Sequence, residues 1–115
     1  MHKELVMYSR TTGCGFVRIA KQVLKENKIP YREVLIDEDP QASLRVKIWT
    51  GFLSVPTLVI TRPGEIVPIT EPMPITPNNS PRGINRGSMI SEASARQLLI
   101  WLQDNDFVPK DTQIE

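Results

Sequence analysis

The chain has 115 residues, of which 40% are hydrophobic and 23% are charged, and its formal net charge is +1 at pH 7. These values are ordinary for a soluble globular protein, and this length suits one domain with a modest core, which we expect to span residues 1–115. No apolar run reaches the roughly 20 residues of a membrane span and no signal peptide precedes the first expected strand, so we expect no membrane partner. One cysteine excludes an internal disulfide and fits a reducing cytoplasm, and one histidine argues against a metal site built from protein ligands alone.

The first expected elements are a strand over residues 5–8 and a helix from Phe16 to about Lys28. Apolar residues recur at helical spacing between positions 16 and 24, as on one buried face. A polar turn joins the two elements and ends at Cys14, the start of the helix. Unpaired N–H groups and the helix dipole stabilise anions there, and the thiolate is the reactive form of cysteine.

A second strand and a second helix follow. The apolar run inside Tyr31–Ile36 predicts a strand that is buried on both faces. Asp39 followed by Pro40 is typical of a helix start, and Gly51 is typical of its end. The apolar stripe of this helix is expected to consist of Leu44 and Ile48.

The remaining pattern predicts two strands, a loop and a helix. Ser54–Ile60 reads as a third strand, and the turn Arg62–Glu65, with proline and glycine at its centre, predicts an antiparallel partner over residues 66–69. Residues 70–90 contain four prolines and predict a long loop inserted before the last helix, which we expect from about Ser91. The element order is therefore β-α-β-α-β-β-α, an α/β fold with a four-stranded mixed sheet.

Two motifs resemble those of the glutaredoxins, a family of the thioredoxin superfamily. The segment YSRTTGCGFVRIAK resembles their active site, a Cys-x-x-Cys or Cys-x-x-Ser motif at a strand-to-helix junction followed by Arg-x-Ala-Lys. Its Cys-Gly-Phe is similar to the monothiol members, but Val17 stands where they have serine. Ser54-Val55-Pro56-Thr57 resembles the Thr-Val-Pro motif, whose proline is cis and faces the cysteine. The resemblance covers about residues 3–67 and implies a thioredoxin/glutaredoxin-like fold with three main helices.

The resemblance also implies a thiol–disulfide oxidoreductase with Cys14 as the nucleophile. Because the chain has no second cysteine, catalysis would be monothiol, with glutathione as the co-substrate. Arg10 would bind a glutathione carboxylate or be an ordinary surface arginine, and Phe16 would contact substrate or belong to the core. The substrate-binding residues that the resemblance implies are Arg10, Gly13, Gly15, Phe16, Val55 and Pro56.

Two other functions remain open. Monothiol glutaredoxins can share a two-iron, two-sulfur cluster across a dimer, in which Cys14 would be the only ligand from this chain. Alternatively, the chain is a thioredoxin-fold interaction domain whose cysteine does not turn over. The expected partners are glutathione or protein mixed disulfides, with the chain a monomer or a weak homodimer. We expect no nucleic acid, because Arg82-Gly83 and Arg86-Gly87 lack aromatic partners.

One part of the glutaredoxin pattern is missing. The family carries a glycine pair after the fourth strand, where the glutamyl end of glutathione binds, and residues 66–75 contain no such pair. Arg86-Gly87-Ser88 is a candidate substitute. We expect residues 81–88 to lie near Cys14, where they would replace the glycine pair or narrow access to the thiol; the alternative is a surface excursion on the far side of the domain.

Overall fold

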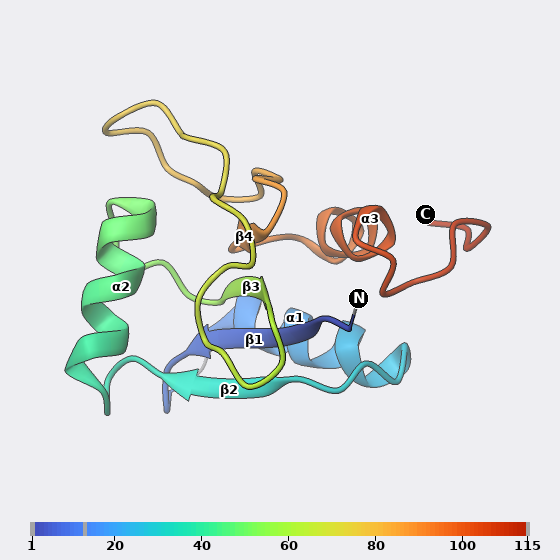
Figure 1. The fold of residues 1–115 in the computed structure, drawn as a ribbon, viewed down its shortest axis with the longest axis horizontal. Helices are drawn as coiled ribbons and strands as arrows, with labels where there is room; N and C mark the ends of the chain where they lie inside the picture. The colour runs from blue at the N-terminus through green and yellow to red at the C-terminus, as the bar shows by residue number, and fades with distance from the viewer. Residues whose placement is uncertain (1, 13, 115) are drawn as a thin grey trace.

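The computed structural model describes residues 2–12 and 14–114. Three helices and four strands alternate much as expected (Figure 1). In chain order they are β1 (Glu4–Ser9), α1 (Gly15–Glu26), β2 (Arg32–Leu35), α2 (Pro40–Thr50), β3 (Thr57–Thr61), β4 (Met89–Ser91) and α3 (Ala95–Asp104).

The four strands form one mixed sheet in the order β2-β1-β3-β4. β1 pairs in parallel with β2 and antiparallel with β3, and β3 pairs antiparallel with β4. The helix α1 makes the crossover between the parallel neighbours β1 and β2, as a parallel pair requires. The predicted α/β fold, with a four-stranded mixed sheet and three helices, is confirmed.

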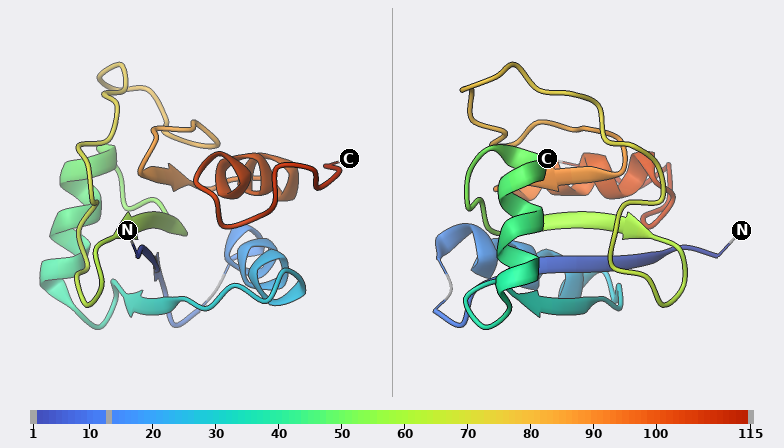
Figure 2. Two further views of the ribbon diagram at one scale, coloured as in Figure 1. Left: turned by 45° about the vertical axis from the view of Figure 1, so that its right-hand side comes forward. Right: turned by 60° about the vertical axis from the view of Figure 1, so that its left-hand side comes forward.

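The sheet separates two apolar clusters. On one face, Leu5 and Met7 of β1 pack with α1 and α3, around the fully buried Trp101. On the other face, Val6 and Tyr8 pack against α2, together with Val17. Figures 1 and 2 show the result, with α2 on one side of the strands and α1 and α3 on the other. The alternation along β1 places successive side chains in opposite clusters.

Local sequence signals set the helix ends. Asp39 caps α2, its carboxylate accepting from the N–H groups of Gln41 and Ala42, and Gly51 ends the helix in the left-handed conformation at φ 79°. Ser94 caps α3 in a capping box with Gln97. The expected caps of α2 are thus confirmed, and α3 starts a few residues later than expected.

The expected fourth strand was wrong. Residues 66–69 form no strand because Pro68 lacks the N–H that a ladder needs. One bond remains, from Ile69 N–H to the Ile60 carbonyl at 2.7 Å, and the strand beside β3 is Met89–Ser91 instead. The connection between β3 and β4 is therefore residues 62–88, which we call the 62–88 loop. The expected turn at its start is confirmed by a bond from Glu65 N–H to the Arg62 carbonyl.

Two burial expectations were also wrong. β2 lies at the edge of the sheet, and its first two residues are exposed, so it is not buried on both faces. On α2, Leu44 is 54% exposed and Ile48 is 71% exposed, while Val46 packs inward with Ala42. The helix is rotated so that Ala42, Val46 and the Trp49 ring, rather than Leu44 and Ile48, meet the sheet.

The 62–88 loop is fastened to the body by Arg86, which is only 7% exposed. Its guanidinium donates to the carbonyl of Met73 and to that of Trp49 at the end of α2, both at 2.7 Å. Burial lowers the pKa of Arg86 from its ordinary value. Among the described residues, no helix is long and apolar enough to cross a membrane.

Candidate functional site

Cys14 is the N-cap residue of the 12-residue helix α1. Its side chain is exposed, and the first turn that follows contains no acidic residue. The Cys14 carbonyl accepts the first helical bond, from Arg18 N–H at 3.1 Å. The thiol therefore sits at the positive end of the helix dipole, with no carboxylate in that turn to oppose a thiolate.

The segment before β3 lies against the thiol. The Cys14 Sγ is 3.7 Å from the carbonyl oxygen of Val55, and the Val55–Pro56 peptide bond is cis, as predicted. Thr57 fixes this segment, because its hydroxyl bonds to the Ser54 carbonyl at 2.8 Å and to the Ser91 hydroxyl at 2.6 Å. The Glu92 N–H donates to the Pro56 carbonyl at 2.8 Å, so the start of β3 is tied to the end of β4.

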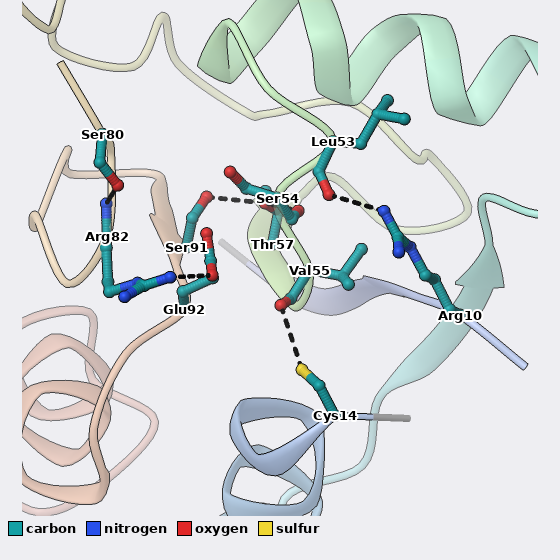
Figure 3. Close-up of polar contacts among 10 residues, drawn as sticks. All are labelled: Arg10, Cys14, Leu53, Ser54, Val55, Thr57, Ser80, Arg82, Ser91 and Glu92. Atoms are coloured by element: carbon teal, nitrogen blue, oxygen red, sulfur yellow. Dashed lines mark hydrogen bonds and ion pairs between the residues drawn. The ribbon is translucent and has the colours of Figure 1, made fainter. Parts of the chain in front are cut away.

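These elements surround an open cavity of about 550 Å³ with Cys14 in its wall (Figure 3). The walls come from the turn before α1, the segment between α2 and β3, the 62–88 loop and the residue after β4. Among the described residues, the lining consists of Arg10, Thr12, Cys14, Phe52, Leu53, Ser54, Val55, Ser80, Arg82 and Glu92. The cavity thus presents a thiol, two guanidinium groups and one carboxylate to solvent.

The residues expected at the site are not all in the cavity wall. Arg10 and Val55 line the cavity, and Arg10 donates to the Leu53 carbonyl at 3.2 Å. Gly15 and Phe16 lie at the start of α1, and the Arg82 guanidinium lies 5.1 Å from the Phe16 ring centroid. Two further expected residues remain: Pro56 is buried behind Val55, and Gly13 lies outside the described residues.

Sequence reasoning missed two charged residues of the cavity, Arg82 and Glu92. They form an ion pair of 3.1 Å, in which the Arg82 side chain is 60% exposed and the Glu92 side chain 16%. No sequence motif marks them, because an isolated arginine or glutamate usually belongs to solvated surface. The prediction that part of the loop approaches Cys14 gave the only indication, and Ser80 and Arg82 do line its cavity.

The candidate substitute for the family's glycine pair was wrong. Arg86 and Ser88 are buried where the loop packs on the body of the protein, and the Gly87 carbonyl accepts from the Trp101 indole N–H at 2.8 Å. None of the three belongs to the described lining of the cavity. The segment after the fourth strand is instead Glu92-Ala93-Ser94, which contains no glycine. Glu92 has a φ of 47°, a left-handed conformation that usually favours glycine, and its carboxylate lines the cavity.

The donor set does not fit a metal centre held by one chain. In residues 2–12 and 14–114 there is no group of three histidine, cysteine, aspartate or glutamate side chains that could hold a metal ion. A two-iron, two-sulfur cluster takes four thiolate ligands, of which Cys14 is one, so three would have to come from other molecules.

Comparison with known proteins agrees with this geometry. The family model described as Glutaredoxin matches residues 5–64, just over half of the 115-residue chain. The match runs from β1 to the turn after β3, and so includes Cys14, Val55 and Pro56 but not Arg82 or Glu92. Neither the curated proteins nor the solved structures give a significant match. A thiol at the start of α1, a cis-proline segment against it and this match together show that the chain belongs to the glutaredoxin family.

Proposed function

We propose that this protein is a glutathione-dependent thiol–disulfide oxidoreductase that works through Cys14 alone. The observation that carries the proposal is the exposed Cys14 thiol at the N-cap of α1, 3.7 Å from the Val55 carbonyl and in the wall of an open cavity. A glutaredoxin-like redox function follows from the family, whereas the dependence on glutathione and the monothiol route are specific to the proposal.

Catalysis takes two exchange steps. In the first, the Cys14 thiolate attacks a sulfur of a glutathione mixed disulfide; the old S–S bond breaks, a Cys14–glutathione disulfide forms, and the released thiolate takes a proton from solvent. In the second, the thiolate of another glutathione attacks the glutathione sulfur of that disulfide. Oxidised glutathione leaves, and Cys14 returns as a thiolate. The net reaction converts the mixed disulfide and one free glutathione into the released thiol and oxidised glutathione.

The second thiol must be external because the sequence contains one cysteine. The position three residues after Cys14, where dithiol glutaredoxins have their resolving cysteine, holds Val17. This side chain is 2% exposed and packs in the apolar cluster beneath α2. Val17 therefore serves the core and, having no thiol, cannot resolve the mixed disulfide.

The surroundings of the thiol suit a peptide disulfide. The start of α1 stabilises a thiolate both before attack and when the cysteine leaves. Among the described residues, the Val55 N–H has no protein partner, so it is available to bond with the backbone of a bound peptide, as in strand addition. Arg10 supplies a cation on the cavity wall for a carboxylate.

The partners in this proposal are glutathione and glutathionylated proteins, and one chain is sufficient for both steps. A single free thiol without a resolving partner suits a reducing compartment such as the cytoplasm. A resident iron–sulfur cluster is not proposed, because one chain supplies one of its four ligands.

The test is the reduction of the mixed disulfide between glutathione and 2-hydroxyethanethiol, coupled to glutathione reductase and NADPH. We expect turnover that depends on glutathione and that disappears in Cys14→Ser, a change of one atom at an exposed position that should leave thermal unfolding unaltered. A wild-type protein that forms the Cys14–glutathione disulfide, seen by mass spectrometry, but never turns over would support the interaction-domain alternative. A wild-type thiol that forms no mixed disulfide would overturn the proposal.

A further inference from the structure

The cavity contains an arginine that lies outside the part of the chain matched by the family model. That match ends at residue 64, and Arg82 belongs to the 62–88 loop, whose residues 80 and 82 reach the cavity wall. Figure 3 shows Arg82 on the opposite side of Val55 and Cys14 from Arg10. The loop therefore adds a cation to the site from a direction that the common part of the fold does not supply.

The backbone around Arg82 is pinned to the sheet. Gly83 N–H donates to the Ser91 carbonyl at 2.7 Å, and Arg82 forms an isolated parallel bridge with Ser91 at the end of β4. The Arg82 N–H also bonds to the Ser80 hydroxyl at 3.2 Å. These contacts fix the point from which the side chain projects, so its position at the cavity does not depend on the side chain's own contacts.

The guanidinium itself lies between the start of α1 and the residue that follows β4. On one side it faces the ring of Phe16, two residues after Cys14, at 5.1 Å from the ring centroid. On the other side one of its terminal nitrogens pairs with a Glu92 carboxylate oxygen at 3.1 Å. A planar guanidinium carries five N–H donors, so this pair and a contact through the ring face leave donors for another acceptor.

The charges at the cavity favour a negative group. Its described lining contains two arginines and one glutamate, and Arg10 is bonded to a backbone carbonyl rather than to a carboxylate. Since Arg82 is 60% exposed, its ion pair with Glu92 is of the weak, solvent-screened kind that an incoming carboxylate can share. Glu92 acts in the opposite direction, because it neutralises part of this charge and repels anions.

We infer that Arg82 is a specificity-determining residue, which selects disulfides that carry a carboxylate on the half that becomes bonded to Cys14, and that Glu92 limits this preference. The inference rests on the proposed function, because it assigns a substrate class to the same thiol. It needs no new chemistry: Cys14 forms one S–S bond as the substrate's S–S bond breaks, and the released thiolate takes a proton. The carboxylate-bearing half is held by Arg82 while the sulfur is attacked.

The test compares three symmetrical disulfides of similar size: 3,3′-dithiodipropionate, which is anionic, 2-hydroxyethyl disulfide, which is neutral, and cystamine, which is cationic. The second-order rate of Cys14 modification is followed by mass spectrometry, without glutathione. For each probe the rate constant of the variant is divided by that of the wild type, and this ratio removes the intrinsic differences in reactivity between the probes. Arg96→Gln is the matched control, because it removes one exposed positive charge from α3, whereas the described lining of the cavity does not include it.

In Arg82→Gln we expect the rate with the anionic probe to fall roughly twofold to fivefold at low salt, the range for one partly screened charge interaction, with little change for the neutral probe. Arg82→Lys should retain part of the preference, and Glu92→Gln should increase it. Arg96→Gln should leave all three ratios near one.

Equal slowing of all three probes in Arg82→Gln would show that the loop was merely disturbed and would overturn the inference, as would unchanged ratios. Failure of the proposed function looks different. If the wild type shows the charge preference but no glutathione-dependent turnover, the catalytic proposal fails and the selectivity stands. If no probe modifies Cys14 in the wild type, both fail.

Discussion

Replacing Arg86 by methionine should loosen the part of the 62–88 loop that packs against the end of α2. The guanidinium is nearly buried and joins three parts of the chain: it donates to the carbonyls of Met73 and Trp49, both at 2.7 Å, and lies 3.4 Å from the Met89 sulfur. No carboxylate is bonded to it among the described residues. Methionine fills much of the same volume, so the substitution removes the donors without opening a large cavity.

The magnitude follows from what the substitution leaves behind. Hydrogen bonds from a charged donor contribute about 1.5–3 kcal/mol each, but removing a buried charge recovers desolvation energy of similar size. The remaining cost is that of two carbonyl oxygens without donors, at about 1–3 kcal/mol each when fully buried and less here, because both bonds are only part-buried. We therefore expect a loss of about 2–4 kcal/mol in the free energy of unfolding, or roughly 8–20 °C in Tm.

Urea unfolding followed by circular dichroism measures this loss, and thermolysin cleavage within residues 62–88 measures release of the loop. Arg62→Met, at an exposed arginine of the same loop, is the matched control and should change stability by less than about 0.5 kcal/mol. Arg86→Lys should fall between the two, because one ammonium cannot reproduce both short bonds. If Arg86→Met unfolds at the wild-type urea concentration and resists thermolysin equally, the loop is held by something other than this guanidinium.

Two other substitutions test single features of the fold and the site. Burial raises the pKa of Tyr8 above its ordinary value, against the opposing hydrogen bond from Arg45, so the neutral phenol is favoured in the folded state and stability should fall as the pH rises above about 10. Tyr8→Phe should lose about 1 kcal/mol at pH 8 with its bond to the Ile66 carbonyl but show a shallower decline between pH 9 and 11, and equal slopes in urea unfolding would contradict the assignment. Val17→Cys should supply a resolving thiol, so that the Cys14–glutathione disulfide, stable in the wild type, decays without added thiol; a disulfide that persists in both proteins would place position 17 out of reach.

The first half of the fold was predictable because its signals are local. The period of the apolar residues in α1, the cap at Asp39 and the left-handed stop at Gly51 all act within a few residues along the chain. Both active-site motifs lie in this half. Cys14 was therefore placed correctly at the start of α1, whereas Val55, expected inside the third strand, lies in the segment before β3.

The fourth strand could not be found in this way. Met89–Ser91 has three residues, too few for a pattern, and its place is decided by pairing with β3 across a long connection. The local sequence of residues 66–69 fits a strand better, but Pro68 has no N–H to donate to the neighbouring strand. The orientation of α2 failed for a related reason, since the sheet accepts Val46 and Ala42 and leaves Ile48 in solvent.

The charged part of the site depends on a chain of contacts that no local pattern encodes. Glu92 reaches the cavity because β4 ends at Ser91, and Arg82 reaches it because Gly83 is bonded to that same residue. Arg86, three residues after Gly83, donates to the Trp49 carbonyl and so holds this part of the loop against α2. A prediction that ends the fourth strand at residue 69 rather than at Ser91 cannot bring these groups together, whatever it infers about Cys14.

This arrangement separates the chemistry of the site from its selectivity. The nucleophile and the segment against it lie within the matched residues 5–64, where the strand-to-helix junction and the start of β3 set their geometry. Arg82 and Glu92 lie beyond the match, where bonds from Gly83 to Ser91 and from Glu92 to Pro56 hold their backbone. If our proposals hold, we therefore expect a change in the loop to alter which disulfides react with Cys14 without altering the start of α1. The loop is held by several polar contacts, of which the Arg86–Trp49 and Gly83–Ser91 bonds are two, so its stability and the position of Arg82 both depend on residues beyond the match.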